Sequence, residues 1–385
     1  MTDMKPLITQ CLVVGILLLF IGTAIMPSIG QRIDKSSLLA SKNHWLYVGG
    51  TGPGNYTKIQ DAIDNASARD TIYVYPGIYY ENLWVNKTLT LIGENQTRTI
   101  VDTRHATGLI VAADQSSISG FTFQNTTTAL VWLSANGSTI SHTIFYIRYT
   151  GQERLGGLAL IGNYNRISNN SFLLYSPSSY GIYLEGQGNL IDHNLIRGCY
   201  EGIQDTAGST NNVIRDCLFE YNDNDIYLFG SHQQLVNNIV TATNMYGIHM
   251  FYARNVLLQG NTISHTRYTA VVLYGCENIT FIGNNFSFSG ETGLDISHSF
   301  QCTISQNNFI ENGDNAYVYT YLFDLLLSFF KKNIWSHNFW SDRDPTKRWY
   351  RVHTDLELLI VWESAITVPW FTFDRSPARE PYRIP

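Results

Sequence analysis

One short pattern of apolar and polar residues recurs through the middle of the chain, from Gly157 to about Phe309. It reads apolar, two variable residues, asparagine, one variable residue, apolar, and its fourth position falls at 170, 194, 217, 238, 261, 284 and 307. The copies therefore follow one another every 21 to 24 residues. A second phrase, a small residue followed by an apolar one, keeps the same period, at Gly157, Gly181, Gly202, Gly247, Ala270 and Gly293. Short β-type runs with a period in the low twenties predict a solenoid.

The composition of each repeat indicates which solenoid this is. No repeat contains an apolar run long enough for a helix, and leucine-rich repeats need another spacing and more leucine. The pattern therefore predicts an all-β, right-handed parallel β-helix with rungs of about 23 residues, stacked roughly 4.8 Å apart. The two apolar positions of the pattern would then stack into two buried columns. The first holds Ile167, Ile191, Ile214, Leu235, Leu258, Phe281 and Ile304, and the second holds Phe172, Ile196, Phe219, Val240, Ile263, Phe286 and Phe309.

The asparagines of the pattern would form a column of their own, at a tight bend between two strands. Asparagine tolerates the left-handed backbone that such corners need. Its amide both donates and accepts, so amides stacked along the axis can bond to one another and to the turn backbone. We interpret this column as structural, with Cys217 as a small substitute in one slot. The ladder consists of Asn170, Asn194, Asn238, Asn261, Asn284 and Asn307.

The flanking segments predict how the chain is divided. Residues 1–30 contain an uncharged apolar run long enough to span a bilayer, which predicts a signal peptide or a membrane anchor. Residues 31–44 read as a linker and 45–112 as an N-terminal cap and the first rungs, with a short amphipathic helix from Ile59 to Asp64. The repeats occupy 113–312, and 313–385 would form the last rung and a C-terminal cap. A second membrane span there is disfavoured because Asp324 splits the apolar run.

Composition and charge narrow the class of partner. The chain is 44% hydrophobic and 15% charged, with a net charge of -6 and no basic block, so we expect no nucleic-acid partner. Membrane contact is expected only through the N-terminal segment. Nine Asn-x-Ser/Thr triplets suit an exported glycoprotein, although an asparagine-rich repeat also generates such triplets by itself. The four cysteines beyond residue 30 fall in different columns, so neither a disulfide framework nor a zinc site is indicated.

Several motifs resemble a known superfamily. The phrases at 59–63, 70–74, 76–79 and 89–93 look like the entry of the pectin-lyase-like parallel β-helix superfamily. The Asn-x-Ile/Phe and Gly-Ile phrases are similar to the repeats of NosD-like and carbohydrate-binding and sugar-hydrolysis (CASH) proteins. The tail phrases at 337–342 and 373–382 resemble the ends of exported prokaryotic proteins of that kind. The resemblance covers nearly the whole chain after the leader and implies the fold strongly, whereas it implies the activity weakly.

The same resemblance implies an active or binding site on an exposed sheet face. Because alternate residues of a strand point outward, the strand after each Gly-Ile phrase defines two outward columns. The first contains Tyr183, Gln204, Tyr227, His249, Val272 and Asp295, and the second Glu185, Thr206, Phe229, Phe251, Tyr274 and Ser297. Aromatic rings suit the apolar faces of sugars. The first hypothesis is therefore a secreted or cell-surface protein that binds a polysaccharide or surface glycan through Tyr183, Tyr227, Phe251 and Tyr274.

A polysaccharide lyase or glycoside hydrolase is the second hypothesis, and a structural envelope protein without ligand is the third. The catalytic candidates are His249, Asp295 and Glu185. His249 and Asp295 would lie roughly 10 Å apart, and Glu185 farther away. Glycosidase carboxyl pairs lie about 5 to 9.5 Å apart, so Glu185 and Asp295 do not suit one. The signature motifs of polygalacturonases, pectate lyases and alginate epimerases are absent from the sequence.

Asp205 stands in a slot where neighbouring rungs place inward apolar residues. A buried carboxylate there is costly unless it is hydrogen-bonded. One interpretation is that the strand ends early and Asp205 caps the turn with Ser209 or Thr210. The other is an acid with a raised pKa.

No cofactor is expected. The ten histidines, among them His193, His232, His265, His298 and His337, are scattered without His-x-His or Met-rich clusters, which disfavours copper. Calcium would accompany only the enzyme hypothesis, on an acidic cluster of one face. We predict no other metal site.

Overall fold

The computed structural model describes residues 43–126, 128–148, 156–176, 178–321, 332–343, 346–361, 364–369 and 372–384. The expected signal peptide or anchor, and nearly all of the expected linker, lie outside these residues. Within the described part of the chain, no helix is long and apolar enough to cross a membrane.

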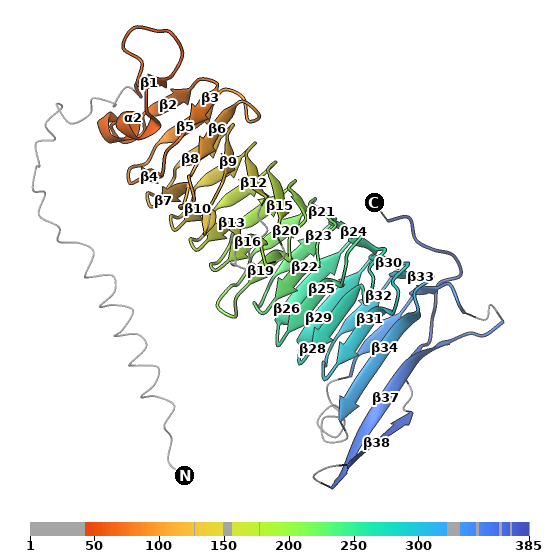
Figure 1. Ribbon diagram of the computed structural model, residues 1–385. Helices are drawn as coiled ribbons and strands as arrows, with labels where there is room; N and C mark the ends of the chain where they lie inside the picture. The colour runs from red at the N-terminus through yellow and green to blue at the C-terminus, as the bar shows by residue number, and fades with distance from the viewer. Residues whose placement is uncertain are drawn as a thin grey trace, which may run out of the picture. The chain divides into compact units, whose positions relative to one another are not determined.

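From Asn43 onward the chain winds into a parallel β-helix (Figure 1). Successive turns add short strands to three sheets, which run side by side along the stack. Strands one turn apart pair in parallel, so that Ile167, for example, lies opposite Ile191. Antiparallel pairing among the described residues involves only the C-terminal strands β37, β38 and β39. The predicted all-β parallel solenoid is confirmed.

The strands of the described chain fall into three sheets, named here A, B and C. Sheet A consists of β1 (Trp45–Val48), β2 (Thr71–Val74), β5 (Thr90–Gly93), β8 (Ser117–Ser119), β11 (Thr139–Ser141), β14 (Arg166–Ser168), β17 (Leu190–Asp192), β20 (Val213–Arg215), β23 (Gln234–Val236), β26 (Arg254–Gln259), β29 (Glu277–Ile282), β32 (Thr303–Ser305) and β35 (Ile334–Ser336). Sheet B consists of β3 (Gly77–Tyr79), β6 (Thr99–Asp102), β9 (Thr122–Gln124), β12 (Ile144–Arg148), β15 (Ser171–Tyr175), β18 (Leu195–Arg197), β21 (Leu218–Glu220), β24 (Ile239–Thr241), β27 (Thr262–Ser264), β30 (Asn285–Ser287), β33 (Asn308–Ile310) and β36 (Phe339–Trp340). Sheet C consists of β4 (Leu83–Val85), β7 (Leu109–Val111), β10 (Ala129–Leu133), β13 (Gly156–Leu160), β16 (Tyr180–Leu184), β19 (Glu201–Asp205), β22 (Asn224–Leu228), β25 (Tyr246–Phe251), β28 (Val271–Tyr274), β31 (Thr292–Ser297), β34 (Asp314–Tyr321), β37 (Tyr350–Val361) and β38 (Ser364–Pro369), and β39 (Thr372–Asp374) pairs with β37.

The core is a continuous rod of stacked side chains between the three sheets. Both apolar columns expected from the repeat are buried, the first on sheet A and the second on sheet B. Aromatic members stack face to face, as Phe145 and Phe172 do with ring centroids 4.3 Å apart. Burying such a side chain contributes about 1.5–3 kcal/mol, and only neighbouring rungs can supply the cover.

A short helix covers the N-terminal end of this core. Helix α2 (Ile59–Asn65) buries Ile59 and Ile63 and contacts β1, β2 and β4. Its own N-cap residue makes no side-chain hydrogen bond, but the Glu81 carboxylate accepts from the first two N–H groups of the helix at 2.9 Å each. Lys87 Nζ donates to three carbonyls at the other end, at 2.8 to 2.9 Å. Two charged residues of the first rungs therefore fasten the predicted capping helix at both ends.

The C-terminal strands cover the opposite end. Strand β37 extends sheet C beyond β34, and β39 folds back against it in antiparallel pairing. The buried Asp374 of β39 accepts hydrogen bonds from Asn338 N and Nδ2, at 3.0 and 3.1 Å, and from Trp340 Nε1, at 3.2 Å. Asn338 follows Asn307 in the asparagine column. The carboxylate of Asp374 thus supplies the acceptor that a further rung would have supplied.

One glycine marks where successive turns come closest. A Cβ atom on Gly162 would lie 1.8 Å from the backbone oxygen of Ala135, an atom that cannot move without shifting the neighbouring rung. We expect Gly162→Ala to lower the free energy of unfolding by about 1–3 kcal/mol, measured by urea denaturation. Gly208→Ala is the matched control, because its nearest neighbour would be 3.9 Å away. Equal unfolding midpoints for the two variants would contradict this close approach.

Candidate functional site

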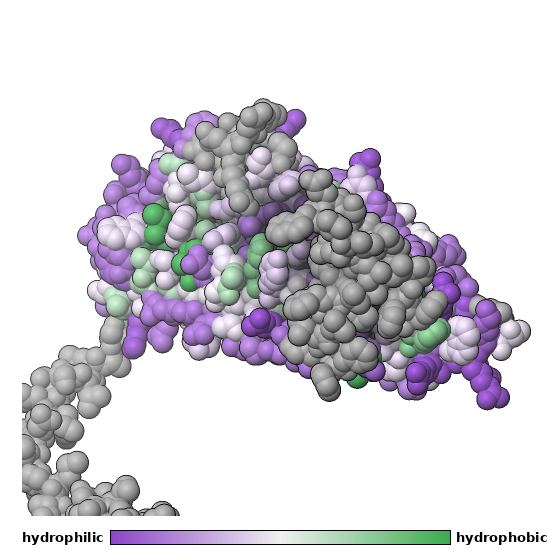
Figure 2. Space-filling model, turned by 90° about the horizontal axis from the view of Figure 1, so that it is seen from below, coloured by the Kyte–Doolittle hydropathy of each residue, from purple (hydrophilic) through white to green (hydrophobic). Residues whose placement is uncertain are grey.

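The outer face of sheet C carries the residues for which a binding role is predicted. Side chains alternate along each strand, and the parallel register aligns the outward ones into one column along the stack. Hydrophobic and pale side chains gather on one face of the molecule within a largely hydrophilic surface (Figure 2). From β4 to β37 this column reads Trp84, Ile110, Trp132, Ala159, Tyr183, Gln204, Tyr227, His249, Val272, Asp295, Tyr317 and His353.

The rings in the middle of this face contact one another. Tyr227 lies 5.1 Å from His249 and 5.2 Å from Phe251, measured between ring centroids. Phe251 lies 4.1 Å from His249, 5.7 Å from Phe229 and 6.0 Å from Tyr274. These five side chains form a continuous surface of partly exposed rings across β22, β25 and β28, which we call the aromatic platform.

His249 lies at the centre of the aromatic platform. Besides Tyr227 and Phe251, its ring has Tyr246 as a neighbour at 5.2 Å. The loss of solvent around it lowers the pKa of His249 from its ordinary value to about 4. The imidazole is therefore neutral at physiological pH. It adds a flat uncharged ring to the platform and is a weak base there.

The three catalytic candidates are not brought together. Val272 of β28 separates His249 from Asp295, so about 10 Å lies between their strands. Asp295 accepts a hydrogen bond from Ser297 Oγ at 2.8 Å, and burial raises the pKa of its carboxyl. Glu185 lies beyond the end of β16, where its carboxylate accepts from Tyr183 OH at 3.4 Å. No pair of these groups has the spacing of a glycosidase carboxyl pair.

The repeat pattern of the sequence did not predict the two tryptophans of this column. Trp84 and Trp132 are 54% and 42% exposed, and each stands between two buried apolar residues of its strand. The alternation Leu83-Trp84-Val85 was a visible signal for an outward aromatic residue. The outward positions were predicted from the Gly-Ile phrase, and that phrase begins only at Gly157, which is C-terminal to both tryptophans.

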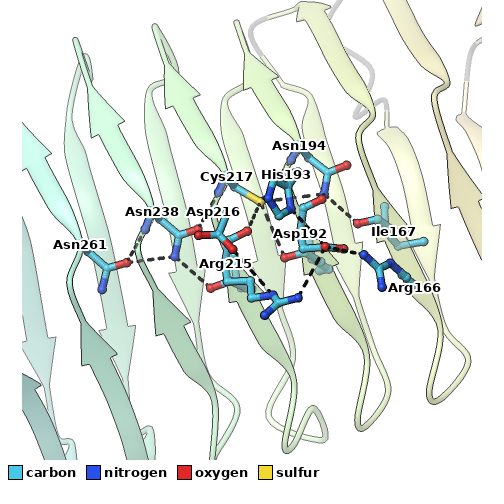
Figure 3. A network of polar contacts seen from close by, with 12 residues as sticks. Arg166, Ile167, Asp192, His193, Asn194, Arg215, Asp216, Cys217, Asn238 and Asn261 are labelled. Atoms are coloured by element: carbon cyan, nitrogen blue, oxygen red, sulfur yellow. Dashed lines mark hydrogen bonds and ion pairs between the residues drawn. The ribbon is translucent and has the colours of Figure 1, made fainter. Parts of the chain in front are cut away.

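The asparagine column lies between sheets A and B (Figure 3). Asn238 is representative: its Nδ2 donates to Asn261 Oδ1 at 3.0 Å and to Ile214 O at 2.9 Å. Cys217 fills one slot, where its N–H donates to Asn238 Oδ1 at 3.1 Å and its Sγ receives a long contact of 3.5 Å from Asn194 N. Burial raises the pKa of the Cys217 thiol to about 12, so it remains protonated. The residues bonded in this way include Asn170, Asn194, Asn238, Asn261, Asn284 and Asn307.

A charged cluster beside this column was not foreseen. The fully buried Asp192 accepts from Arg166 Nη2 at 2.7 Å, and its Oδ2 lies 3.1 Å from His193 Nδ1 and 3.8 Å from Arg215 Nη2 (Figure 3). Two arginines from the adjacent turns thus compensate one carboxylate. Because the Asp192 side chain has no exposed surface, a ligand cannot reach it, and we interpret the cluster as a clasp between β14, β17 and β20.

Asp205 requires a correction. Strand β19 extends through Asp205, which lies opposite Leu184 and points into the core, so the strand does not end early. The carboxylate accepts from Phe229 N at 2.5 Å, from Gly230 N at 3.1 Å and from Gln233 Nε2 at 3.0 Å, all on the following turn. The expected cap with Ser209 or Thr210 is wrong, because the next turn offers these donors. Burial raises the pKa of Asp205 to about 7, against the effect of those hydrogen bonds.

Metal-binding chemistry has little support in the described part of the chain. No group of three or more His, Cys, Asp or Glu residues there is arranged to hold a metal ion. Cys199, Cys217, Cys276 and Cys302 are buried free thiols. The residues of the aromatic platform suit stacking and hydrogen bonding.

Comparison with known proteins agrees with this architecture. The family described as "Right handed beta helix region" matches residues 107–249 and 180–329, which together span more than half of the 385-residue chain. No curated protein sequence matches the chain.

Two solved structures illustrate the likeness of fold. The Dettilon tailspike protein is 13% identical, with a TM-score of 0.53; the match covers 66% of this chain but only 59% of the tailspike. A mannuronic acid specific polysaccharide family 6 lyase from human gut microbiota is 12% identical, with a TM-score of 0.50, over 78% of this chain and 87% of the lyase. Identities this low show the fold alone. The family match and the observed turns together place this chain in the right-handed beta helix family.

Proposed function

We propose that this protein binds an extended polysaccharide along the outer face of sheet C, with the aromatic platform as the central contact. The observation that carries the proposal is the run of mutually contacting, partly exposed rings across β22, β25 and β28. Such rings present apolar faces on which the C–H face of a sugar can stack. The column continues through Trp132 to Trp84, so a long chain would meet further rings toward the N-terminal end.

The electrostatics of the platform favour binding over cleavage. A general base works best with a pKa near the operating pH, whereas the pKa of His249 is about 4. A lyase also needs a cation beside the base to neutralise the uronate carboxyl. The outward column from Trp84 to His353 contains no lysine or arginine. The column therefore supplies stacking surface, whereas His249 is a weak base and no lysine or arginine of the column stands beside it.

The ligand class is inferred from chemistry and fold together. One solved protein of similar fold is named as a mannuronic acid specific polysaccharide lyase, which makes polysaccharides the first ligands to test. A regular array of strands with rings on several turns also suits an extended polymer better than a compact ligand.

Removing the central ring of the platform tests the proposal. Phe251→Ala is expected to weaken polysaccharide binding about tenfold, because Phe251 contacts four other rings and its loss opens a gap in the stacking surface. The measurement is isothermal titration calorimetry of the full chain with neutral and acidic oligosaccharides of increasing length. Affinity should rise with length until the platform is covered.

Phe288→Ala is the matched control. Phe288 is an exposed phenylalanine stacked on His265, at 5.0 Å, and it follows β30 of sheet B instead of facing outward from sheet C. This variant should bind like the unchanged protein. Equal losses in the two variants, or no loss with Phe251→Ala, would overturn the proposal.

We also propose that the protein works outside the cytoplasm, secreted or held at the cell surface. The support is the uncharged segment from residue 6 to residue 31 and the nine Asn-x-Ser/Thr triplets. If the protein is held at the cell surface, protease added to intact cells should degrade it. If the protein is secreted, it should be present in the culture medium. Full protection from protease, with lysis required for degradation, would contradict export.

A further inference from the structure

A cleft of about 290 Å³ opens at the corner where the chain passes from sheet B to sheet C. Three tyrosines from three successive turns line it: Tyr175 at the end of β15, Tyr200 before β19 and Tyr221 after β21. They are 47%, 38% and 54% exposed. None of them belongs to the outward column of sheet C, so this cleft is a separate surface from the aromatic platform.

Backbone features keep the rings in place around the cleft. Gly198 lies beneath Tyr175, since a Cβ atom on Gly198 would stand 3.1 Å from Tyr175 Cδ1. Tyr221 has a left-handed backbone, with φ of 56°, and the Arg197 guanidinium lies 4.8 Å from the centre of its ring. Arg197 also pairs with Glu220 at 3.5 Å. The cation is thus occupied in bracing the Tyr221 ring, and it is not among the groups that line the cleft.

The remaining lining groups are polar and carry no positive charge. Asn244 Nδ2 donates to Asp223 Oδ1 at 2.9 Å, which holds an amide and a carboxylate side by side. Ser176 is 5% exposed, and its buried Oγ has no hydrogen-bond partner among the described residues. The Ser176 hydroxyl is buried behind the lining, so the partly exposed Asp223 and the exposed Asn244 are the polar side chains that a ligand can reach.

We propose that this corner cleft binds one neutral hexose unit. The apolar face of a pyranose ring can stack on a tyrosine, while its hydroxyls can hydrogen-bond to Asp223 and Asn244. The volume is near the lower end of the range for small-molecule sites, which suits one sugar ring. The Asp223 carboxylate disfavours a uronate, because like charges would meet without a lining cation to separate them.

The test is saturation-transfer NMR on the full chain with a methyl hexoside, with dissociation constants obtained by titration. Methyl glucuronide and choline serve as the acidic and cationic comparison ligands. The neutral glycoside should bind and the glucuronide should not. Tyr221→Ala should weaken binding of the neutral glycoside about tenfold, and Tyr221→Phe should preserve it because the ring remains.

Tyr164→Ala is the matched control for the substitution. Tyr164 is 67% exposed, has φ of 56° and lies over Gly188 of the next turn, so it shares the local geometry of Tyr221 but lies outside the cleft. It should leave hexoside binding unchanged. Thermal unfolding of every variant separates a lost contact from a damaged fold.

The outcomes separate this cleft from the aromatic platform. Hexoside binding that survives Phe251→Ala but falls with Tyr221→Ala supports the cleft, whatever the polysaccharide titrations show. Equal binding of the glucuronide, binding of choline alone, or no hexoside binding would each overturn the proposal. Loss of hexoside binding with Phe251→Ala and not with Tyr221→Ala would overturn it too, since the sugar would then lie on the platform.

Discussion

Replacing Asn238 with leucine is expected to lower the free energy of unfolding by about 2–5 kcal/mol. The amide of Asn238 donates to Ile214 O and Asn261 Oδ1 and accepts from Cys217 N, at 2.9, 3.0 and 3.1 Å. Leucine has a similar size but leaves a buried carbonyl and a buried N–H group without partners. Each such group costs about 1–3 kcal/mol. On the preceding turn the column is weaker, because Asn194 meets the Cys217 sulfur at 3.5 and 3.8 Å where other turns offer an amide oxygen.

Urea denaturation followed by circular dichroism measures this effect. Gln259→Leu makes the same kind of change, amide to leucine, at an exposed residue of β26, and it should shift the unfolding midpoint little. If both variants unfold at the same urea concentration as the unchanged protein, the column does not stabilise the fold.

The second large effect concerns Asp225, a carboxyl buried in the slot where the two adjacent turns have Gly202 and Gly247. Burial raises the pKa of Asp225 from its ordinary value of 3.8 to about 7, although Thr243 Oγ1 and Asn222 Nδ2 donate hydrogen bonds to it. The unfolded chain loses this proton near pH 4, whereas the folded chain keeps it until about pH 7. The contribution of the neutral carboxyl to stability is therefore fully present below pH 4 and is lost as the pH rises to 7.

Asp225→Asn should remove this dependence. An amide can still accept from Asn222 and can donate to the Thr243 hydroxyl, so the hydrogen bonds are preserved without a titrating group. At pH 8 we expect the variant to be more stable than the unchanged protein by roughly 1–4 kcal/mol, and near pH 4 we expect the two to be similar. Urea midpoints measured from pH 4 to pH 8 give the comparison.

Asp61→Asn, at an exposed position of α2, controls for the loss of one surface charge. The urea midpoint of Asp61→Asn should change with pH in the same way as that of the unchanged protein. A constant difference between Asp225→Asn and the unchanged protein at every pH would contradict a raised pKa at Asp225.

The repeat made the solenoid predictable because each turn buries similar apolar residues at equivalent positions. The apolar columns of Ile167 and Phe172 follow from residues spaced one turn apart, so a count along the sequence was enough. The same count placed Tyr227 and His249 in one outward column, as the strand register has them. Their roles in binding or catalysis stay predictions.

Features that depend on contacts between particular turns could not be predicted from the repeat. The partners of Asp205 lie on the following turn, 24 to 28 residues away, and no pattern in the sequence links them to Asp205. The clasp around Asp192 joins arginines 26 residues before and 23 residues after it. The low pKa of His249 arises from rings on neighbouring strands, and their spacing exists only in the folded chain.

The most direct test of the account is a glycan-array screen of the full chain, with each bound glycan then incubated overnight and assayed for new reducing ends and for unsaturated uronate absorbance. We predict that polysaccharides bind, that Phe251→Ala removes most of the signal, and that neither product forms. Product formation that disappears with His249→Ala would contradict the account, because the outer face of sheet C would then be an active site. Binding that is indifferent to Phe251→Ala would equally contradict it, because the glycan would then lie elsewhere.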